Sequence, residues 1–152
     1  MVEAVAGDGG ADMVLPGPLP WAGAVYDGAS DSIRAARNLA ADFMERLQRA
    51  YRIALSTRVV GAVQLVVSEL VTNVCKHAPG PCALDLVLVG RSLEIRVWDS
   101  SFRVPVPDVP DPGRVGRHGL EIVTALCGEI DVRREPVGKR VRVRIALESA
   151  PA

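Results

Sequence analysis

A chain of 152 residues has the length of one ordinary domain, and it can bury a hydrophobic core without disulfides or metals. Its 18 basic and 18 acidic residues give a formal net charge of zero, which argues against nucleic acid or a membrane surface as a partner. The three cysteines have no C-x-x-C spacing, and no apolar run reaches the ~18 residues of a membrane helix. We therefore expect a cytoplasmic protein with reduced thiols and no direct contact with nucleic acid or membrane.

The N-terminal part of the chain divides into a leader and two helical segments. Residues 1–20 are rich in Gly, Pro and Ala, so we expect a flexible leader before one domain at 21–149. Apolar residues recur at steps of three and four over about 32–50 and over 57–77, which predicts two amphipathic helices. The second helix should end near its last residue because Pro79 follows shortly afterwards.

After the second helix the apolar period changes to alternation, which predicts β-strands arranged as two hairpins. A long loop and a third helix are expected between the hairpins. This order predicts an α+β fold with a mostly antiparallel sheet and helices on one face. The expected elements are a short first strand at 21–26, strands at 83–89 and 92–98, a loop at 99–117, a helix at 118–128, and strands at 129–135 and 139–147.

The predicted second helix carries a polar stripe, opposite its valines and leucines, formed by Glu69, Asn73, Lys76 and His77. A carboxylate can accept a proton from a hydroxyl, and an amide oxygen suits magnesium that keeps water and phosphate ligands. The lysine can neutralise phosphate, and the histidine can do so when it is protonated. Any surface helix shows a polar stripe, however, so the helix alone does not establish a site.

Two further features follow along the chain. Asp99 ends a predicted strand, where its carboxylate could accept a hydrogen bond from a purine amino group or simply form a turn. A glycine-containing run then joins the long loop to the third helix, where free backbone N–H groups suit phosphate, although a plain loop-to-helix junction has the same form. The residues of this run are Gly116, Arg117, His118, Gly119 and Leu120. In chain order, the three features supply a base, a magnesium ligand and phosphate-binding groups.

The segments VVSELVTNVCKHA, IRVWDSS and GRHGLEIV resemble the signature boxes of the GHKL, or Bergerat-fold, ATPases. Over about 30–147 the chain is most similar to short bacterial histidine-kinase-like ATP-binding proteins, which include anti-sigma factors that are also serine-protein kinases. The resemblance implies a two-layer α/β sandwich that binds ATP and Mg²⁺. It makes Glu69 the general base, Asn73 the magnesium ligand, and Asp99 the carboxylate that reads the adenine amino group.

By the same resemblance, Gly116 and Gly119 are glycines of a flexible ATP lid, and Arg117 and His118 lie between them near the phosphates. The remaining candidate contacts to the nucleotide are Lys76, His77 and Leu120.

The chain departs from the family pattern at two places. The first box often continues as Asp-x-Gly, whereas this chain has Asp99-Ser100-Ser101. The last box usually has Gly-Thr or Lys-Thr before the final strand, whereas here Gly138 is followed by Lys139 and Arg140. A hydroxyl that helps to hold adenine is therefore missing, which bears on nucleotide affinity.

These observations lead to a functional hypothesis and two alternatives. The leading hypothesis is an ATP-binding anti-sigma factor with serine/threonine-protein kinase activity toward an anti-anti-sigma antagonist. Its partners would be that antagonist, a sigma factor, or both. The first alternative is a catalytically weak or inactive ATP-binding module that sequesters a protein partner, which the altered last box favours. The second is an α+β domain whose polar stripe is merely solvated. The resemblance also allows a homodimer, although the sequence has no interface signature.

Overall fold

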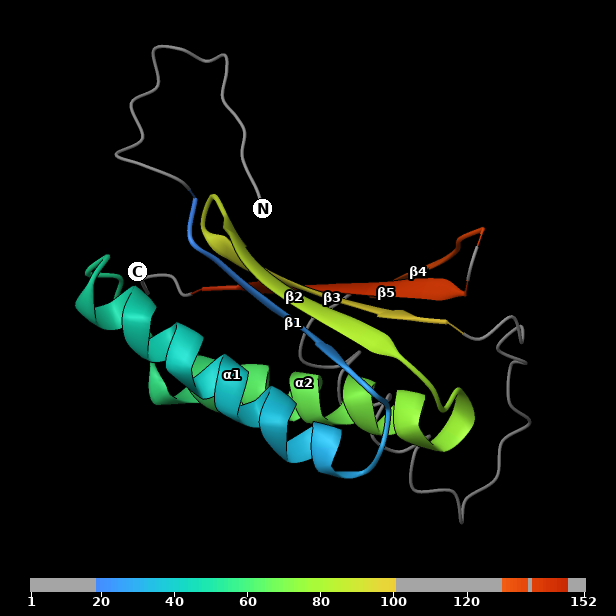
Figure 1. Cartoon of the computed structure of the whole chain (residues 1–152). Coiled ribbons are helices and arrows are strands. Elements are labelled where there is room, and N and C mark those ends of the chain that lie inside the picture. Colours follow the sequence, from blue (N-terminus) through green and yellow to red (C-terminus); the bar gives the residue numbers. More distant parts are fainter. Residues whose placement is uncertain (1–18, 101–129, 137, 148–152) are drawn as a thin grey trace.

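The computed structural model describes residues 19–100, 130–136 and 138–147, which form one sheet and one layer of helices (Figure 1). Each element lies within one residue of its expected bounds. The helices are α1 (Asp31–Arg49) and α2 (Thr57–His77), and the strands are β1 (Trp21–Tyr26), β2 (Cys82–Val89), β3 (Ser92–Asp99), β4 (Ile130–Arg134) and β5 (Lys139–Ala146). The expected helix at 118–128, and the expected loop from residue 101 onward, lie outside the described residues.

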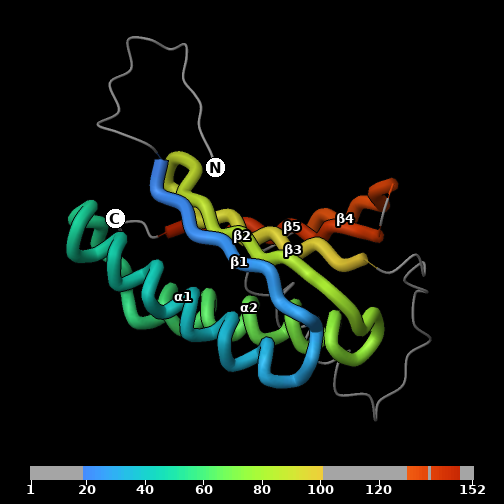
Figure 2. Tube along the Cα trace, viewed as in Figure 1, coloured from blue at the N-terminus to red at the C-terminus, as the bar shows by residue number. Residues whose placement is uncertain are grey.

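The five strands form a single sheet in the order β1-β2-β3-β5-β4, and every neighbouring pair is antiparallel. Both α1 and α2 lie on the same face of this sheet, as the tube view also shows (Figure 2). The other face carries no described helix. The expected α+β architecture, with an antiparallel sheet and helices on one face, is therefore confirmed.

The central helix α2 begins at a well-formed cap. Ser56 has an extended backbone, and its hydroxyl accepts a hydrogen bond from the Val59 amide at 3.1 Å. Along the helix, six valines and one leucine are buried. By length and hydropathy α2 could cross a membrane. In this fold, its apolar side instead packs against α1 and the sheet, which accounts for its composition.

Alternation along the strands divides the sheet into two chemically different faces. Leu93, Ile95 and Val97 of β3 point to the helices together with Val143 and Ile145 of β5, and all five are buried in the core. The intervening residues of β3 and β5 point to the opposite face. This shared core forms because β3 pairs with β5, a strand far away in the sequence. The registers within the two hairpins would not by themselves bring these side chains together.

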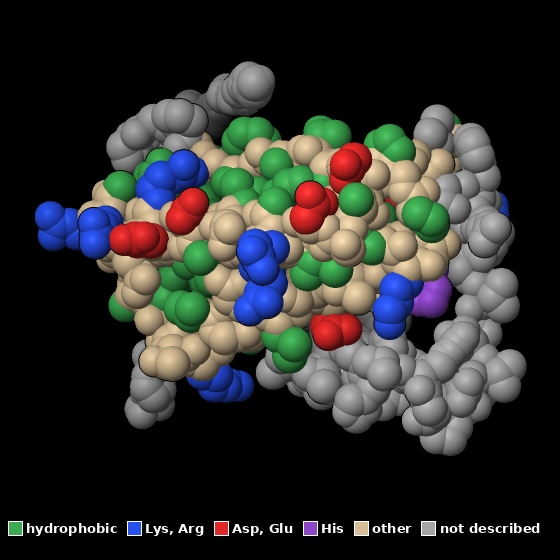
Figure 3. Space-filling view, turned by 60° about the horizontal axis from the view of Figure 1, so that its bottom comes forward, with side chains coloured by type: hydrophobic (Ala, Val, Ile, Leu, Met, Phe, Trp, Pro, Cys, Tyr) green, Lys and Arg blue, Asp and Glu red, His purple; other side chains and the backbone are tan. Residues whose placement is uncertain are grey.

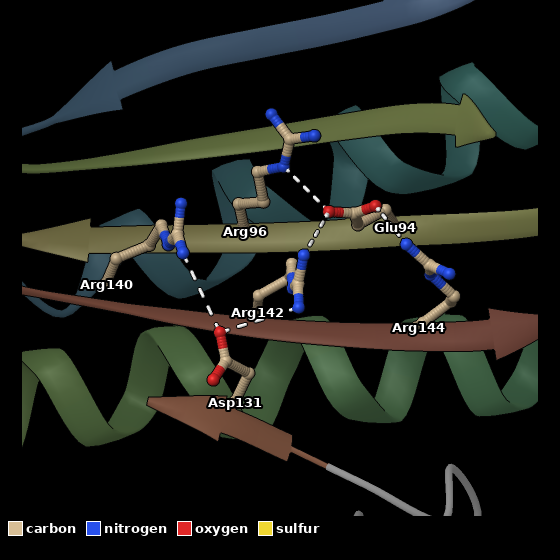
Figure 4. A network of polar contacts seen from close by, with 6 residues as sticks. All are labelled: Glu94, Arg96, Asp131, Arg140, Arg142 and Arg144. Atoms are coloured by element: carbon tan, nitrogen blue, oxygen red, sulfur yellow. Dashed lines mark hydrogen bonds and ion pairs between the residues drawn. The ribbon is translucent and has the colours of Figure 1, made fainter. Parts of the chain in front are cut away.

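The open face of the sheet holds a network of charges centred on Glu94 (Figure 4). This carboxylate is almost fully buried, with 3% of the side chain exposed, because three arginines cover it. Arg96 and Arg144 donate hydrogen bonds to it at 3.1 and 3.2 Å, and Arg142 lies 3.7 Å away. Arg142 also pairs with Asp131 of β4, so the network links three strands.

Candidate functional site

The candidate site residues that the structure describes come from one end of the sandwich. The C-terminal half of α2 leads directly into the start of β2, and Cys82 at that start pairs with Asp99 at the end of β3. Asp99 in turn pairs with Lys139, the first residue of β5. The polar end of α2 and the ends of three strands are therefore brought to the same edge of the fold (Figure 1).

Asp99 lies on the helix-facing side of the sheet, two positions beyond the core residue Val97. Its side chain is 2% exposed. The Lys139 ammonium donates a hydrogen bond to Asp99 Oδ2 at 2.6 Å, and the lysine side chain is itself only 20% exposed. A charge-assisted hydrogen bond of this length between two shielded groups is a strong one. The sequence singled out Asp99 as a candidate site residue but did not predict that Lys139 pairs with it.

The backbone around Asp99 is fixed from two sides. Gly138, in the β4–β5 turn, has a φ of +83°, and a side chain there would overlap the Asp99 carbonyl oxygen. On the other side, the Ser100 hydroxyl donates a hydrogen bond to the Pro81 carbonyl oxygen at 3.0 Å. The serine that follows Asp99 thus ties β3 to the segment before β2, while Ser101 lies outside the described residues.

The polar stripe of α2 is graded in exposure. Glu69 and Asn73 are half-buried, whereas Lys76 and His77 at the helix end are exposed. Glu69 and Asn73 therefore flank the buried side of α2. The sequence pattern had placed them opposite that side. The reason for the difference is that the apolar arc of α2 is wide, since it includes adjacent buried residues, Val66 with Val67 and Leu70 with Val71, which point about 100° apart.

A contact made by Cys75 shows which side of α2 faces the start of α1. The Cys75 thiol donates a weak hydrogen bond to the carbonyl oxygen of Ala29, just before α1, at 3.5 Å. Successive helical residues are rotated by about 100°. Asn73, two residues before Cys75, therefore points to nearly the opposite side of α2. Glu69 and Asn73 therefore lie on the side of α2 away from α1.

The two described cysteines near this edge are not reactive thiolates. Burial, the largest influence, acts together with the nearby Cys75, Asp99 and Asp27 to raise the pKa of Cys82 to about 11. Burial also raises the pKa of Cys75, with Asp27 and Asp31 adding to the effect. Both thiols therefore stay protonated at neutral pH, which argues against a thiolate metal site or a cysteine nucleophile here.

The donor set suits a hard cation that brings its own ligands. In the described ranges there is no group of three or more His, Cys, Asp or Glu side chains that could hold a metal ion. The half-buried amide of Asn73 offers one neutral oxygen, which fits Mg²⁺ when phosphate oxygens and water complete the shell. The described residues do not by themselves provide a complete set of ligands for a metal ion.

A shallow cavity of about 480 Å³ lies elsewhere, between α1 and the first half of α2. Its lining includes Met44, Val60 and Gln64, more than one helical turn before Glu69. On the helix-bearing side of the molecule, acidic and basic side chains are interspersed with hydrophobic ones (Figure 3). Neither feature marks the edge that contains Asp99, so the candidate site rests on the residues described above.

Comparison with known proteins decides the family. Residues 30–145 match the sequence model of a family described as "Histidine kinase-like ATPase domain". The chain belongs to this family. Among curated proteins, no match is found.

A solved structure supports the fold assignment. The chain resembles the histidine kinase domain of the blue-light-activated histidine kinase of Erythrobacter litoralis EL346, with a TM-score of 0.50 and 19% sequence identity. The similarity covers 74% of this chain and 61% of that domain. At this identity the comparison concerns the fold alone. Together with the family match, it confirms the resemblance to GHKL-type ATPases and makes ATP the expected ligand.

Some of the predicted site residues lie within the described ranges and others lie outside them. The lid residues Gly116, Arg117, His118, Gly119 and Leu120 lie outside the described residues. The roles of Glu69, Asn73 and Asp99 stay predictions, although these three occupy an edge of the fold where they could serve one ligand. Lys139 is the residue whose importance sequence reasoning missed. The alternation of VRVRI after it, which fixes the face on which it lies, was the available signal.

Proposed function

We propose that this histidine kinase-like ATPase domain is an ATP-binding regulatory protein, an anti-sigma factor with serine/threonine-protein kinase activity toward an anti-anti-sigma antagonist. One observation carries the proposal. In a chain of the ATPase family, the buried carboxylate of Asp99 lies on the helix-facing side of the sheet, at the edge to which the Asn73 half of α2 leads. This arrangement suits a nucleotide whose base lies at the sheet and whose phosphates extend along α2.

Each residue has a chemically defined part in this proposal. Asp99 accepts a hydrogen bond from the adenine amino group, and Asn73 holds Mg²⁺ through its side-chain oxygen. Bound magnesium supplies charge neutralisation at the phosphates. Lys76, exposed at the end of α2, adds positive charge there. These assignments need only positioning and charge, which is what phosphoryl transfer chiefly demands.

Glu69 completes the transfer step. Its carboxylate accepts the proton of the attacking serine hydroxyl of the antagonist. The serine oxygen forms a bond to the γ-phosphorus while the bond from that phosphorus to the β–γ bridging oxygen breaks, and ADP leaves. Glu69 is half-buried on the side of α2 away from α1, which suits a base that must be shielded yet reach a second protein.

The partners follow from the family resemblance in the sequence. A sigma factor, the antagonist or both would be bound in the cytoplasm, with a homodimer as a further arrangement. Nucleotide would then control which partner is held. A purified sigma factor and a purified antagonist, each titrated against the protein with and without ATP, test this directly. If ATP leaves both partner affinities unchanged, regulation by nucleotide is wrong.

Nucleotide binding is tested first, by calorimetric titration of the full chain with ATP in the presence and absence of Mg²⁺. We expect Asp99→Asn to weaken binding by about tenfold or more, since it converts a charged acceptor into a neutral amide. Asp42→Asn makes the same chemical change on the exposed side of α1 and should have no effect. If the wild-type protein fails to bind millimolar ATP, the proposed function is overturned.

Catalysis is tested separately, with radiolabelled ATP and a purified antagonist domain. Glu69→Ala should abolish transfer while leaving ATP affinity nearly unchanged. Glu45→Ala, at an exposed position of α1 that pairs only with Arg49 among the described groups, serves as the matched control. Equal transfer by wild type and Glu69→Ala would rule out the assigned role.

A second candidate function has its own support. In this one the protein binds ATP but regulates only by sequestering its partner. The observation that favours it is the Lys139–Asp99 pair, which lies in the box where the family usually has Gly-Thr or Lys-Thr and this chain has no threonine. Binding of ATP and partner without any label transfer, in the experiment above, would select this function.

A further inference from the structure

We propose that Lys139 is a built-in competitor for the carboxylate of Asp99 and that it thereby holds nucleotide affinity low. This inference rests on the proposed role of Asp99 in reading the base. It assigns to Lys139 a specific part in that same site, namely control of how readily the base is accepted.

The lysine is placed for this role by the sheet itself. Asp99 and Lys139 are direct partners in the β3–β5 register, so their side chains leave the sheet on the same side. The preceding residue, Gly138, packs on the Asp99 backbone, which leaves the turn little room to shift. With 20% of its side chain exposed, Lys139 is not a mobile surface lysine that meets Asp99 by chance.

The competition is unequal in chemical terms. The ammonium of Lys139 is a charged donor, and its 2.6 Å hydrogen bond to Asp99 Oδ2 is stronger than one from a neutral amino group of a base. A base that displaces the ammonium must also leave a largely buried cation without its partner, which is unfavourable. A base that shares the carboxylate must do so beside the ammonium. Either route makes binding weaker than it would be with a small neutral residue at position 139.

A purely structural role for the pair makes a different forecast. If Lys139 served only to neutralise a buried carboxylate, its removal would destabilise the protein and would leave nucleotide affinity unchanged or lower it. If it competes with the base, its removal destabilises the free protein but strengthens nucleotide binding, because the base no longer has to displace the ammonium or share the carboxylate with it. The two effects of opposite sign are the signature of competition.

The experiment measures ATP affinity and thermal unfolding of the full chain for Lys139→Thr, Lys139→Met and Lys139→Arg. We expect Lys139→Thr to bind ATP about fivefold to tenfold more tightly, the difference between a charged and a neutral competing hydrogen bond. The free protein should melt at a lower temperature, and saturating ATP should raise its melting temperature by more than in the wild type. Lys139→Met should share the gain in affinity, and Lys139→Arg should behave like the wild type.

Arg91→Gln provides the control for loss of a positive charge, because Arg91 lies in the turn at the opposite end of β3. If Lys139→Thr does not fold, Lys139→Met must show the gain. Unchanged or weaker ATP binding by the folded variants would overturn the inference, while the proposed function would stand as long as Asp99→Asn still weakens binding. If no variant binds ATP, both proposals fall.

Discussion

The β4–β5 turn packs directly on the end of β3, because Gly138 sits against the carbonyl oxygen of Asp99 with no space for a side chain. Gly138 also has a φ of +83°, which an L-residue rarely adopts. The candidate base-reading residue is therefore held in place by backbone contacts as well as by its lysine partner.

Replacing this glycine should be costly. Gly138→Ala is expected to lower the free energy of unfolding by about 2–4 kcal/mol, the sum of left-handed strain and overlap with the Asp99 backbone. Gly90→Ala is the matched control, because Gly90 also has a positive φ, of +61°, but nothing lies near its added Cβ. That variant should lose only about 1 kcal/mol. Urea unfolding checks both, and equal losses would show that packing on Asp99 does not matter.

A third glycine should respond in the opposite direction. Gly61 lies within α2 and is exposed, and a Cβ there would meet open space. Gly61→Ala should therefore stabilise the protein by about 0.5–1 kcal/mol, because alanine restricts the unfolded chain and favours the helix. Thermal unfolding followed by circular dichroism measures the gain. A lower melting temperature would contradict the open space around this position.

The cap of α2 makes a separate contribution to stability. Ser56→Ala removes the hydrogen bond from the Val59 amide and should cost about 1 kcal/mol. Ser30 precedes α1 in the equivalent position, but its side chain makes no capping hydrogen bond among the described residues. Ser30→Ala should therefore have a much smaller effect. Chemical unfolding of the two variants distinguishes them, and a similar loss in both would refute the difference in capping.

Acid should weaken the charge network on the open face. Burial, the largest influence on Glu94, raises its pKa, but the hydrogen bonds and charges of Arg96 and Arg144 together bring that pKa below its usual value. A carboxyl whose pKa is lowered by folding stabilises the protein above its unfolded pKa, and that contribution disappears as the pH falls through the folded pKa. At pH 7, Glu94→Gln should cost on the order of 1–2 kcal/mol, a modest value because the arginines are partly exposed.

The measurement is urea unfolding of wild type and Glu94→Gln from pH 7 to pH 3. The difference between the two proteins should shrink as the solution is acidified below the usual pKa of a glutamate. Glu45→Gln, whose carboxylate is exposed, should match the wild type throughout. A difference that stays constant with pH would show that the charge of Glu94 does not contribute.

Cysteine labelling should reflect burial. Cys82 is 4% exposed and its pKa is raised to about 11, so roughly one molecule in a thousand carries the thiolate at pH 8. We expect iodoacetamide to modify Cys82 very slowly in the folded protein and rapidly in urea, as peptide mass spectrometry can resolve. Rapid modification under native conditions would mean that this edge of the sheet opens readily.

Much of the fold was predictable because its signals are local. The apolar spacing changes from helical to alternating after His77, and glycine turns occur at Gly90 and Gly138. With such local signals, the bounds of every described element were predicted to within one residue. The pairing of β3 with β5 depends on a register between segments about forty residues apart, which no local pattern encodes.

The candidate site could be proposed from the sequence as a set of residues but not as an arrangement. Sequence motifs identified Glu69, Asn73 and Asp99 because their spacing resembles that of the family. The Lys139–Asp99 pair and the burial of Glu94 both arise from the β3–β5 register, so they could not be derived from motifs. The alternating arginines of β5 were visible, but their acidic partners, Glu94 and Asp131, were not.

The ends of the sheet have a practical consequence. The amide of Leu88 bonds to the carbonyl oxygen of Pro20, and the amide of Leu147 bonds to that of Arg91, so the chain enters β1 and leaves β5 beside the same β2–β3 turn. That turn is at the far end of the strands from Asp99. An affinity tag or surface tether joined through either end of the fold would therefore orient an immobilised molecule with its candidate nucleotide edge toward the solution.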